Sequence, residues 1–253
     1  MFYYFLYDVM RTLYINNFFT DIYFNLAAEE FLLKNHVEPI FMLWQNTPSV
    51  VLGKHQCVDM EVNMDFARKK SIRVARRYSG GGAVYHDFGN LNLTFIENTK
   101  APDFGKYTRQ ILQFLNSVGV RAQADSRLGI NINQFKISGS AQCIYKTRVM
   151  YHCTLLYNTD LDVLRASLVG RGPCRGISGK FAVPSVKSPV TNVSKYLDIP
   201  LSIQEFREQV FEFFLHSDIQ REVYDLSLDE IANIEQLRNE KYATSRWIFD
   251  RAF

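Results

Sequence analysis

The chain has 253 residues, which is enough to bury a full core, and its 47% hydrophobic content excludes a disordered polypeptide and a collagen-like repeat. Its formal net charge of +3 comes from 29 Lys and Arg residues scattered among 26 Asp and Glu residues, too small an excess to indicate a nucleic-acid partner. We expect a single domain over residues 1–253, with no membrane partner.

The N-terminal segment from Met1 to Tyr7 is apolar, but no basic residues precede it and Asp8 follows it directly. It is also too short to span a bilayer, so it is neither a convincing signal peptide nor a membrane anchor. Met10 offers a second start, before a strand predicted over 11–15. Residues 1–9 are therefore a candidate upstream extension.

Hydrophobic periodicity predicts the elements of the first half. Asp21 is a plausible N-cap for an amphipathic core helix over 24–33, with Leu26, Glu30 and Leu33 at helical spacing. The further predictions are strands at 40–44, 49–52, 72–75 and 91–96, and helices at 59–70 and 107–118, the last ended by Gly119. Residues 91–96 alternate apolar and polar side chains, so one face can line a core or a pocket.

The second half begins with strand candidates at 128–132, 134–138 and 150–157. Residues 170–189 are rich in Gly, Pro and Ser and predict a mobile loop, and helical patterns follow from 203 and over 228–237. Strands dominate the middle and helices the tail, without regular alternation. This order favours an α+β fold over a doubly wound sheet.

The four cysteines are too sparse for a secreted disulfide scaffold and show no CxxC spacing; they are Cys57, Cys143, Cys153 and Cys174. A reducing, cytoplasmic location fits this usage best, and a metal site built on them is not expected.

The strongest chemical signal is the segment from Arg76 to Asn92, which reads Arg-Arg-Tyr-Ser-Gly-Gly-Gly-Ala-Val-Tyr-His-Asp-Phe-Gly-Asn-Leu-Asn. Three consecutive glycines can surround an anion with backbone N–H groups, and the paired arginines supply positive charge. The alternative is a glycine-rich hairpin, but a plain turn needs neither the arginines nor His86-Asp87. The Walker and dinucleotide glycine patterns are both absent.

Two further segments carry candidate residues. Lys136 lies between Phe135 and Ile137 on a predicted strand, which places it on the opposite face from them, ahead of a Ser-Gly-Ser-Ala turn. His152 could contact a ligand or be a satisfied core histidine. Taken alone, a lysine and a histidine of this kind do not distinguish a site from ordinary surface and core.

Together these motifs resemble the lipoate-protein ligase catalytic domain. The resemblance rests on Arg-Arg-x-Ser-Gly-Gly-Gly-Ala-Val-x-His-Asp-x-Gly-Asn, Lys-Ile-Ser-Gly-Ser-Ala and His-x-Thr-Leu-Leu, with Phe-Asn-Leu-Ala-x-Glu-Glu earlier and Lys187-Ser-Pro-Val-Thr-Asn192 later. It implies a mixed, mostly antiparallel β-sheet flanked by helices, shared with biotin-protein ligases. It also implies a two-step reaction: lipoate and ATP give lipoyl-AMP, and a protein lysine then accepts the lipoyl group.

The resemblance also assigns roles by position. Lys136 is the implied catalytic residue and touches both ATP and lipoate, and His152 is a second candidate for lipoate binding. The implied ATP and lipoyl-AMP contacts are Arg77, Gly82, Ala83, Val84, Tyr85 and Lys136. The further candidates for magnesium, loop support or the acyl pocket are Gly80, Gly81, His86 and Asn90.

Substrate chemistry completes these expectations. Mg²⁺ should accompany ATP, because it neutralises phosphate charge, and no protein ligand to a metal is assigned. The dithiolane and its alkyl chain need an apolar slot, for which the expected walls are Val51, Leu52, Leu91 and Leu93. The implied acceptors are the lipoyl domains of 2-oxoacid dehydrogenase acyltransferase subunits and the glycine cleavage H protein.

Departures from the family pattern leave alternatives open. Cys153 stands where members usually have Gly, Cys143 where many have Arg, and the chain ends about where a small accessory domain would begin. The chain could therefore need a separate accessory-domain protein, acting alone only as a lipoyl-AMP-dependent lipoyltransferase. An ATP-independent octanoyl or lipoyl transferase with a cysteine thioester is the other alternative. It is disfavoured because residues 125–134 contain no cysteine.

Overall fold

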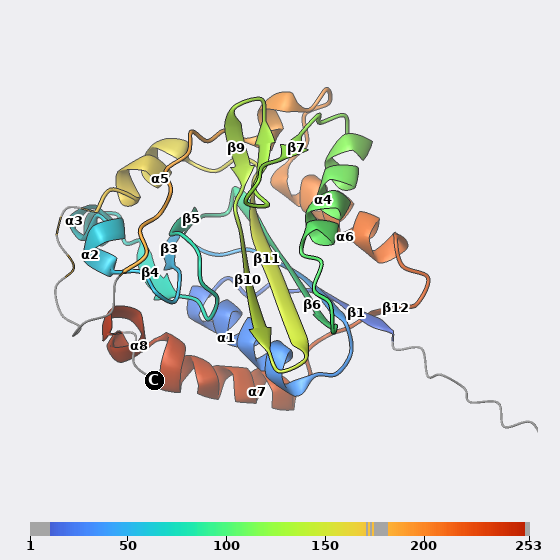
Figure 1. Cartoon of the computed structure of the whole chain (residues 1–253), viewed down its shortest axis with the longest axis horizontal. Coiled ribbons are helices and arrows are strands. Elements are labelled where there is room, and N and C mark those ends of the chain that lie inside the picture. Colours follow the sequence, from blue (N-terminus) through green and yellow to red (C-terminus); the bar gives the residue numbers. More distant parts are fainter. Residues whose placement is uncertain (1–10, 171, 173, 175–181, 251–253) are drawn as a thin grey trace, which may run out of the picture.

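The computed structural model describes residues 11–170, 172, 174 and 182–250 (Figure 1). The candidate extension at 1–9 and part of the loop expected at 170–189 lie outside the described residues. No helix among those described is both long and apolar enough to cross a bilayer.

The strands are β1 (Thr12–Asn16), β2 (Ile40–Trp44), β3 (Ser49–Leu52), β4 (Arg73–Arg76), β5 (Val84–His86), β6 (Asn90–Asn98), β7 (Gln123–Ala124), β8 (Ile130–Ile132), β9 (Phe135–Ser138), β10 (Ser140–Tyr145), β11 (Arg148–Leu156) and β12 (Arg221–Val223). The helices are α1 (Ile22–Asn35), α2 (Val58–Glu61), α3 (Met64–Lys69), α4 (Gly105–Ser117), α5 (Leu161–Ser167), α6 (Ile203–His216), α7 (Leu228–Leu237) and α8 (Ser245–Asp250). A 3₁₀ helix, η1 (Val193–Tyr196), and a π-helical turn, η2 (Arg238–Tyr242), complete the set.

A six-stranded sheet in the order β10-β11-β6-β2-β1-β12 forms the centre of the molecule. Its pairs are antiparallel from β10 to β2 and parallel from β2 to β12. Two three-stranded sheets, β4-β3-β5 and β7-β8-β9, accompany it. The expected α+β fold with a mixed, mostly antiparallel sheet is therefore confirmed.

The two faces of the central sheet divide the core. Apolar residues of α4 and α6, such as Ile111, Phe114 and Phe214, pack against one face in the same cluster as Leu91 and Leu93 of β6. Helix α1 covers the other face, where it joins alternate residues of the same strands in a second cluster. The period of two in β-strands thus assigns neighbouring residues of one strand to different layers.

Helix α1 begins where the sequence indicated, because the Asp21 side chain accepts hydrogen bonds from the backbone N–H groups of Tyr23 and Phe24. The prediction of an amphipathic helix was wrong in one respect. Its polar residues Asn25, Glu29 and Glu30 are buried along with the apolar ones. Since a buried carboxylate requires partners, these residues mark contacts that the sequence pattern could not show.

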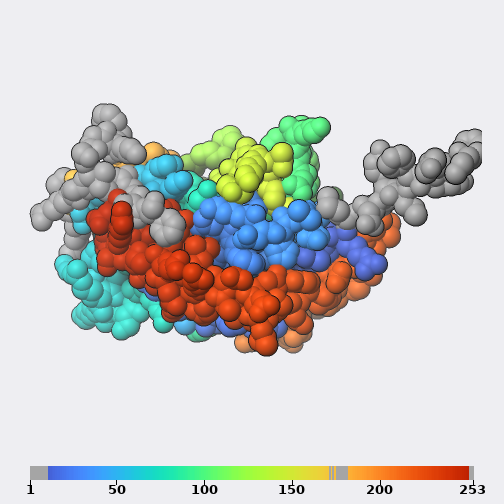
Figure 2. All heavy atoms as spheres, turned by 90° about the horizontal axis from the view of Figure 1, so that it is seen from below, coloured from blue at the N-terminus to red at the C-terminus, as the bar shows by residue number. Residues whose placement is uncertain are grey.

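The C-terminal segment supplies some of those partners. Figure 2 shows it stretched across the lower face of the molecule, next to the N-terminal part of the chain. Lys241 Nζ and the Tyr242 hydroxyl donate to Glu30 Oε2 at 2.7 and 2.5 Å. The tail is therefore fixed to α1 by a buried ion pair.

Several predicted elements differ from the structure. The helix expected over 59–70 is split into α2 and α3, with Asn63 capping the second. The turn expected after Lys136 contains only Gly139, because Ser140 already begins strand β10. Strands β5 and β12 and helix α5 were not predicted, since their three to seven residues are too short for a clear period.

Candidate active site

A cavity of about 740 Å³ brings the sequence motifs together. The glycine segment forms one wall with Arg77, and Lys136 and His152 lie on others. Apolar side chains, among them Leu26 and Trp44, also line it. Its size is that of a small-molecule site, with charged groups and apolar surface in a single space.

Arg77 is buried at this cavity, with 5% of its surface exposed. Its guanidinium donates to the carbonyl oxygens of Gly80, Gly82 and Val51, and its Nε donates to Ser79 Oγ at 3.0 Å. Burial lowers the pKa of Arg77 to about 10, and the charge of Glu29 acts in the opposite direction. The side chain is therefore a cation that shapes the glycine loop from inside.

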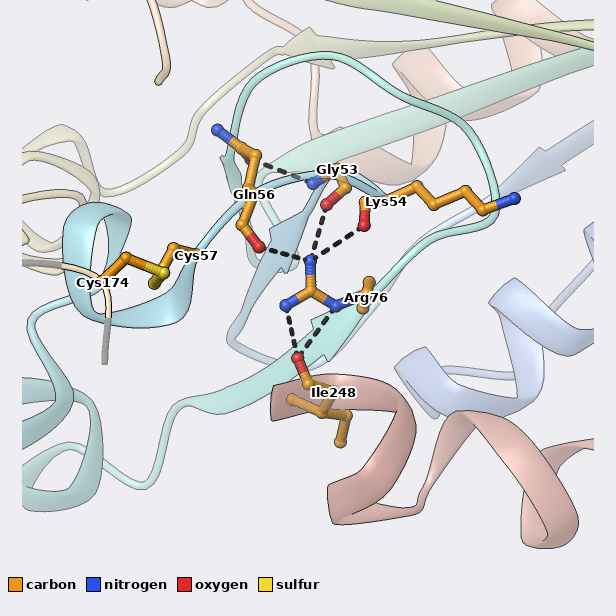
Figure 3. The surroundings of a disulfide bond; sticks show 7 residues. All are labelled: Gly53, Lys54, Gln56, Cys57, Arg76, Cys174 and Ile248. Atoms are coloured by element: carbon orange, nitrogen blue, oxygen red, sulfur yellow. Dashed lines mark hydrogen bonds between the residues drawn. A yellow bond between two sulfur atoms is a disulfide. The ribbon is translucent and has the colours of Figure 1, made fainter. Parts of the chain in front are cut away.

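Arg76, the other arginine of the pair, has a different role from the one expected. Figure 3 shows it between the loop after β3 and the C-terminal helix. It donates to the carbonyl oxygens of Gly53 and Gln56, both at 2.8 Å, and to that of Ile248 at 2.5 Å. It is not among the lining residues. Its charge joins three chain segments behind the site, so of this pair only Arg77 lines the cavity, where Arg127 and Arg165 are further lining arginines.

The glycine loop owes its shape to close backbone packing. Gly81 has φ of +86°, a conformation that side chains rarely adopt, and a Cβ on Gly53 would lie 2.0 Å from its carbonyl oxygen. The loop's Ala83 N–H donates to Ser185 Oγ at 2.8 Å. Ser185 belongs to the described part of the loop expected at 170–189. One of the predicted anion-binding N–H groups is thus already paired within the chain.

Lys136 is held by its backbone and its surroundings. Its N–H donates to the Pro189 carbonyl and its carbonyl accepts from Thr191, so the later Lys187–Asn192 motif pairs with this strand. Its side chain lines the cavity, while Ile137 is fully buried in the core, as the alternation predicted. Nζ lies 3.8 Å from Asp125 Oδ2. Burial lowers the pKa of the Lys136 ammonium, and Asp125 opposes that shift.

The histidines His86 and His152 both line the cavity. His152 hydrogen bonds to Glu29 and to Ser79, each at 2.7 Å. His86 Nδ1 accepts from Asn46 at 2.8 Å, so its hydrogen is on Nε2, a buried atom without a partner among the described residues. Burial lowers the pKa of His86 to about 3. It is therefore a neutral hydrogen-bond donor at the cavity wall.

The predicted site residues divide into those that line the cavity and those that do not. Those that line the cavity are Arg77, Gly81, Gly82, Ala83, Val84, Tyr85, His86, Lys136 and His152. Gly80 and Asn90 are outside the lining: the Gly80 carbonyl accepts from Arg77, and Asn90 donates to the side chain of Asn92. Residues that sequence reasoning missed include Ser79, which lies inside the glycine motif, Trp44 at the end of β2, and Glu61 and Ser185, which no motif marked as site residues.

The expected apolar walls need correction. Val51 lines the cavity, but Leu52, Leu91 and Leu93 belong to the core clusters on other faces. The reason is strand alternation, since Asn92 of β6 lines the cavity between two leucines that point to the α4 and α6 layer. The apolar wall is built instead by residues distant in sequence, such as Leu26, Trp44, Leu156 and Leu164.

The cysteines give no activated nucleophile. Burial raises the pKa of the free thiols of Cys143 and Cys153 to about 12, so neither forms a thiolate readily at neutral pH. Cys57 and Cys174 form a disulfide, with Cα atoms 5.7 Å apart (Figure 3). The sequence did not indicate this pairing, because 117 residues separate the two positions. It connects the segment before Ser185 to the start of α2.

Comparisons with known proteins agree with this geometry. The family model described as Lipoyl protein ligase A/B catalytic domain matches residues 21–215. The chain is 40% identical over 241 residues to Lipoate–protein ligase 1 from Staphylococcus aureus, covering 93% of this chain and 72% of that protein. It is similar to the crystal structure of lipoate-protein ligase A bound with ATP, with a TM-score of 0.78, 26% identity and coverage of 95% and 99%.

A second solved structure extends the likeness. It is the bipartite lipoate protein ligase of an archaeal lipoylation system from Thermoplasma acidophilum, with a TM-score of 0.78 and 25% identity. The match covers 96% of this chain and 98% of that one. This chain therefore belongs to the lipoate-protein ligase family and carries its catalytic domain.

Proposed function

We propose that this chain activates lipoate with ATP and transfers the lipoyl group to a specific lysine of a lipoyl domain. In the first step a carboxylate oxygen of lipoate attacks the α-phosphorus of ATP, the bond to the β-phosphate breaks, and pyrophosphate leaves. In the second, the acceptor amine attacks the carbonyl carbon of lipoyl-AMP and loses a proton. The bond to the phosphate oxygen breaks, and AMP leaves.

The observation that carries this proposal is the shared cavity. Lys136, Arg77 and the glycine loop line the same space as Leu26, Trp44 and Leu156. An acyl-adenylate has an anionic phosphate between its nucleoside and its apolar acyl chain. A space with both kinds of wall suits such a molecule better than it suits a free nucleotide.

Two cations support the first step. Lipoate and triphosphate are both anions, so their repulsion must be offset where they meet. Lys136 presents a compact point charge to the cavity, and we assign it the bridge between the carboxylate and the α-phosphate. Arg77, with the N–H groups of Gly82 and Ala83, is assigned to the phosphates. His86 Nε2 and His152 are assigned to the acyl side.

Mg²⁺ fits this site as a companion of ATP. Glu61 is the single carboxylate among the described lining residues, and Oε1 of that carboxylate accepts the Ser185 N–H at 2.9 Å. The described chain has no cluster of three His, Cys, Asp or Glu residues that could hold a metal. The ion would therefore be held mainly by phosphate oxygens and water, which matches the usual preference of Mg²⁺, and would neutralise phosphate charge there.

The acceptors we propose are lipoyl domains of 2-oxoacid dehydrogenase acyltransferases and the glycine cleavage H protein. A second function is supported by the likeness to the bipartite archaeal ligase. In that case this chain transfers the lipoyl group from lipoyl-AMP, and activation requires a separate accessory-domain protein.

One assay separates these readings. The chain is incubated with an apo lipoyl domain and either lipoate with Mg-ATP or synthetic lipoyl-AMP, and modification is followed by mass spectrometry. We expect modification under both conditions. Modification from lipoyl-AMP alone indicates the bipartite system. Transfer from an acylated carrier protein without nucleotide would contradict ligase chemistry and revive the thioester alternative.

Replacing Ser185 with alanine should lower the KM for ATP. The Ser185 hydroxyl accepts the Ala83 N–H and also the Gln56 amide at 2.9 Å, so nucleotide must displace it to reach that N–H. Loss of one neutral hydrogen bond predicts a change of about fivefold. Steady-state pyrophosphate release at varied ATP measures it. A raised KM would show that Ser185 helps to bind nucleotide instead.

We also place the reaction in the cytoplasm, where ATP is available. In such a reducing compartment, Cys57 and Cys174 should be free thiols in the cell and pair only after oxidation. Alkylation of intact cells before lysis, followed by peptide mass spectrometry, should find both residues modified. Recovery of the disulfide-linked peptide from alkylated cells would contradict this location.

A further inference from the structure

A chain of buried hydrogen bonds connects helix α1 to the arginine of the glycine loop. Glu29 Oε1 lies 2.7 Å from His152 Nδ1, His152 Nε2 lies 2.7 Å from Ser79 Oγ, and Arg77 Nε donates to Ser79 Oγ at 3.0 Å. All four side chains are less than 10% exposed. They come from three segments: α1, the loop after β4, and β11 of the central sheet. We call this set the Glu29 to Arg77 chain.

Donor chemistry limits the arrangement of hydrogens at both ends of this set. A guanidinium only donates, so Ser79 Oγ accepts from Arg77. A carboxylate only accepts, so His152 Nδ1 donates to Glu29. The Thr94 hydroxyl also donates to Glu29 Oε1 at 2.6 Å, and Trp44 Nε1 donates to Thr94 at 2.9 Å. A chain in which each member has its partner is rigid.

Glu29 and Arg77, the two ends of this hydrogen-bonded set, carry opposite charges. Arg77 is buried, and the Glu29 charge favours its protonated form against the effect of burial. The loop carbonyls that bind its NH1 and NH2 carry no formal charge. Arg77 Nε donates both to Ser79 Oγ at 3.0 Å and to the Gly80 carbonyl at 3.1 Å, so Ser79 fixes this side of the guanidinium together with the backbone. Glu29 supplies charge balance through His152. The orientation of Arg77 depends on residues that do not bind it directly.

We propose that Ser79, His152 and Glu29 are positioning residues that hold Arg77 in the orientation needed for the phosphates of ATP. This inference rests on the proposed function, which assigns Arg77 to those phosphates. His152 also lines the cavity, so it connects the part of the cavity assigned to the acyl group with the glycine loop. Wall residues of an acyl pocket would affect lipoate alone, whereas positioning residues affect ATP.

The test uses variants that remove different hydrogen bonds of the Glu29 to Arg77 chain. Ser79→Ala removes the link to Arg77. His152→Asn keeps a donor near Nδ1 for Glu29 but loses Ser79, and His152→Gln keeps a partner near Nε2 for Ser79 but loses Glu29. Ser117→Ala is the matched control, because among the described residues its hydroxyl donates only to the Phe114 carbonyl at the end of α4. Melting temperatures show whether each variant folds.

For each variant, pyrophosphate release is measured at varied ATP and at varied lipoate. Ser79→Ala should raise the KM for ATP at least about tenfold, the usual effect of losing a hydrogen bond to a charged group, with the KM for lipoate within about twofold of the parent value. Both His152 variants should raise the KM for ATP as well. Ser117→Ala should match the parent.

An unchanged KM for ATP in Ser79→Ala, or a rise in the KM for lipoate alone, would overturn the proposal. So would parallel losses for both substrates with a lowered melting temperature, which indicate a purely structural role. Calorimetric titration with Mg-ATP distinguishes failure of this proposal from failure of the proposed function. If the parent binds Mg-ATP but forms no adenylate, activation fails while positioning is still tested: weaker binding by Ser79→Ala supports it, and equal binding refutes it.

Discussion

Lys136→Ala should nearly abolish adenylate formation while leaving the fold intact. Its ammonium lines the cavity 3.8 Å from Asp125 and is the cation assigned to the meeting point of carboxylate and α-phosphate. Removing one preorganised charge of this kind reduces a rate by about a hundredfold to a thousandfold. Pyrophosphate release with lipoate and Mg-ATP measures the loss. Circular dichroism and the melting temperature check the fold.

The rate of adenylate formation should also depend on pH through the charge of Lys136. Burial lowers the pKa of Lys136, so the charged form should be lost, and activity should fall, at a lower alkaline pH than for an exposed lysine. Lys195→Ala is the matched control, since Lys195 is exposed and does not line the cavity. Parent-like adenylate formation by Lys136→Ala would show that the assignment is wrong.

Gly129→Ala should reduce adenylate formation almost as strongly, although Gly129 is not itself a candidate ligand. A Cβ at this position would lie 2.7 Å from both Cε and Nζ of Lys136 and 2.6 Å from Asp125 Oδ2. The flexible end of the lysine side chain must move to make room, and so must the Asp125 carboxylate, which accepts from the N–H groups of Arg127 and Gly129. The cost in positioning is large, and a misplacement of about 1 Å predicts a loss of about a hundredfold.

The measurement is again pyrophosphate release, together with the melting temperature. Gly172→Ala provides the control, because the nearest contact of its Cβ is Asp59 Cβ at an ordinary 3.8 Å. A parent-like rate in Gly129→Ala would mean that the lysine reaches its substrates from another rotamer. A large fall in melting temperature would assign the loss to folding instead.

Local signals in the sequence predicted much of the fold. The bounds of β2 and β3, the Asp21 cap of α1 and the end of α4 before Gly119 all follow from residues adjacent in the chain. These features depend on hydrogen bonds and steric contacts within a few residues, so a pattern of neighbours is sufficient to indicate them. The glycine segment and the placing of Lys136 opposite Ile137 were visible for the same reason.

Contacts across long separations were decided by the tertiary structure. Arg76 resembles Arg77 in sequence, yet it binds the carbonyl of Ile248, 172 residues away, instead of facing the cavity. Leu91 and Leu93 looked suitable for an acyl slot, but the register of β6 between β2 and β11 turns them to the opposite layer. Strand order and register depend on the whole core, which no local window contains.

The sequence by itself determined the family resemblance, the α+β class and the identity of the main candidates, because ordered motifs and strand periods are written in consecutive residues. The structure alone decided how Arg77 is supported. His152 hydrogen bonds to Glu29, which is 123 residues away in the sequence, and Ser185 hydrogen bonds to Ala83, which is 102 residues away. These buried polar groups find partners only when packing removes water and brings distant segments within hydrogen-bonding distance.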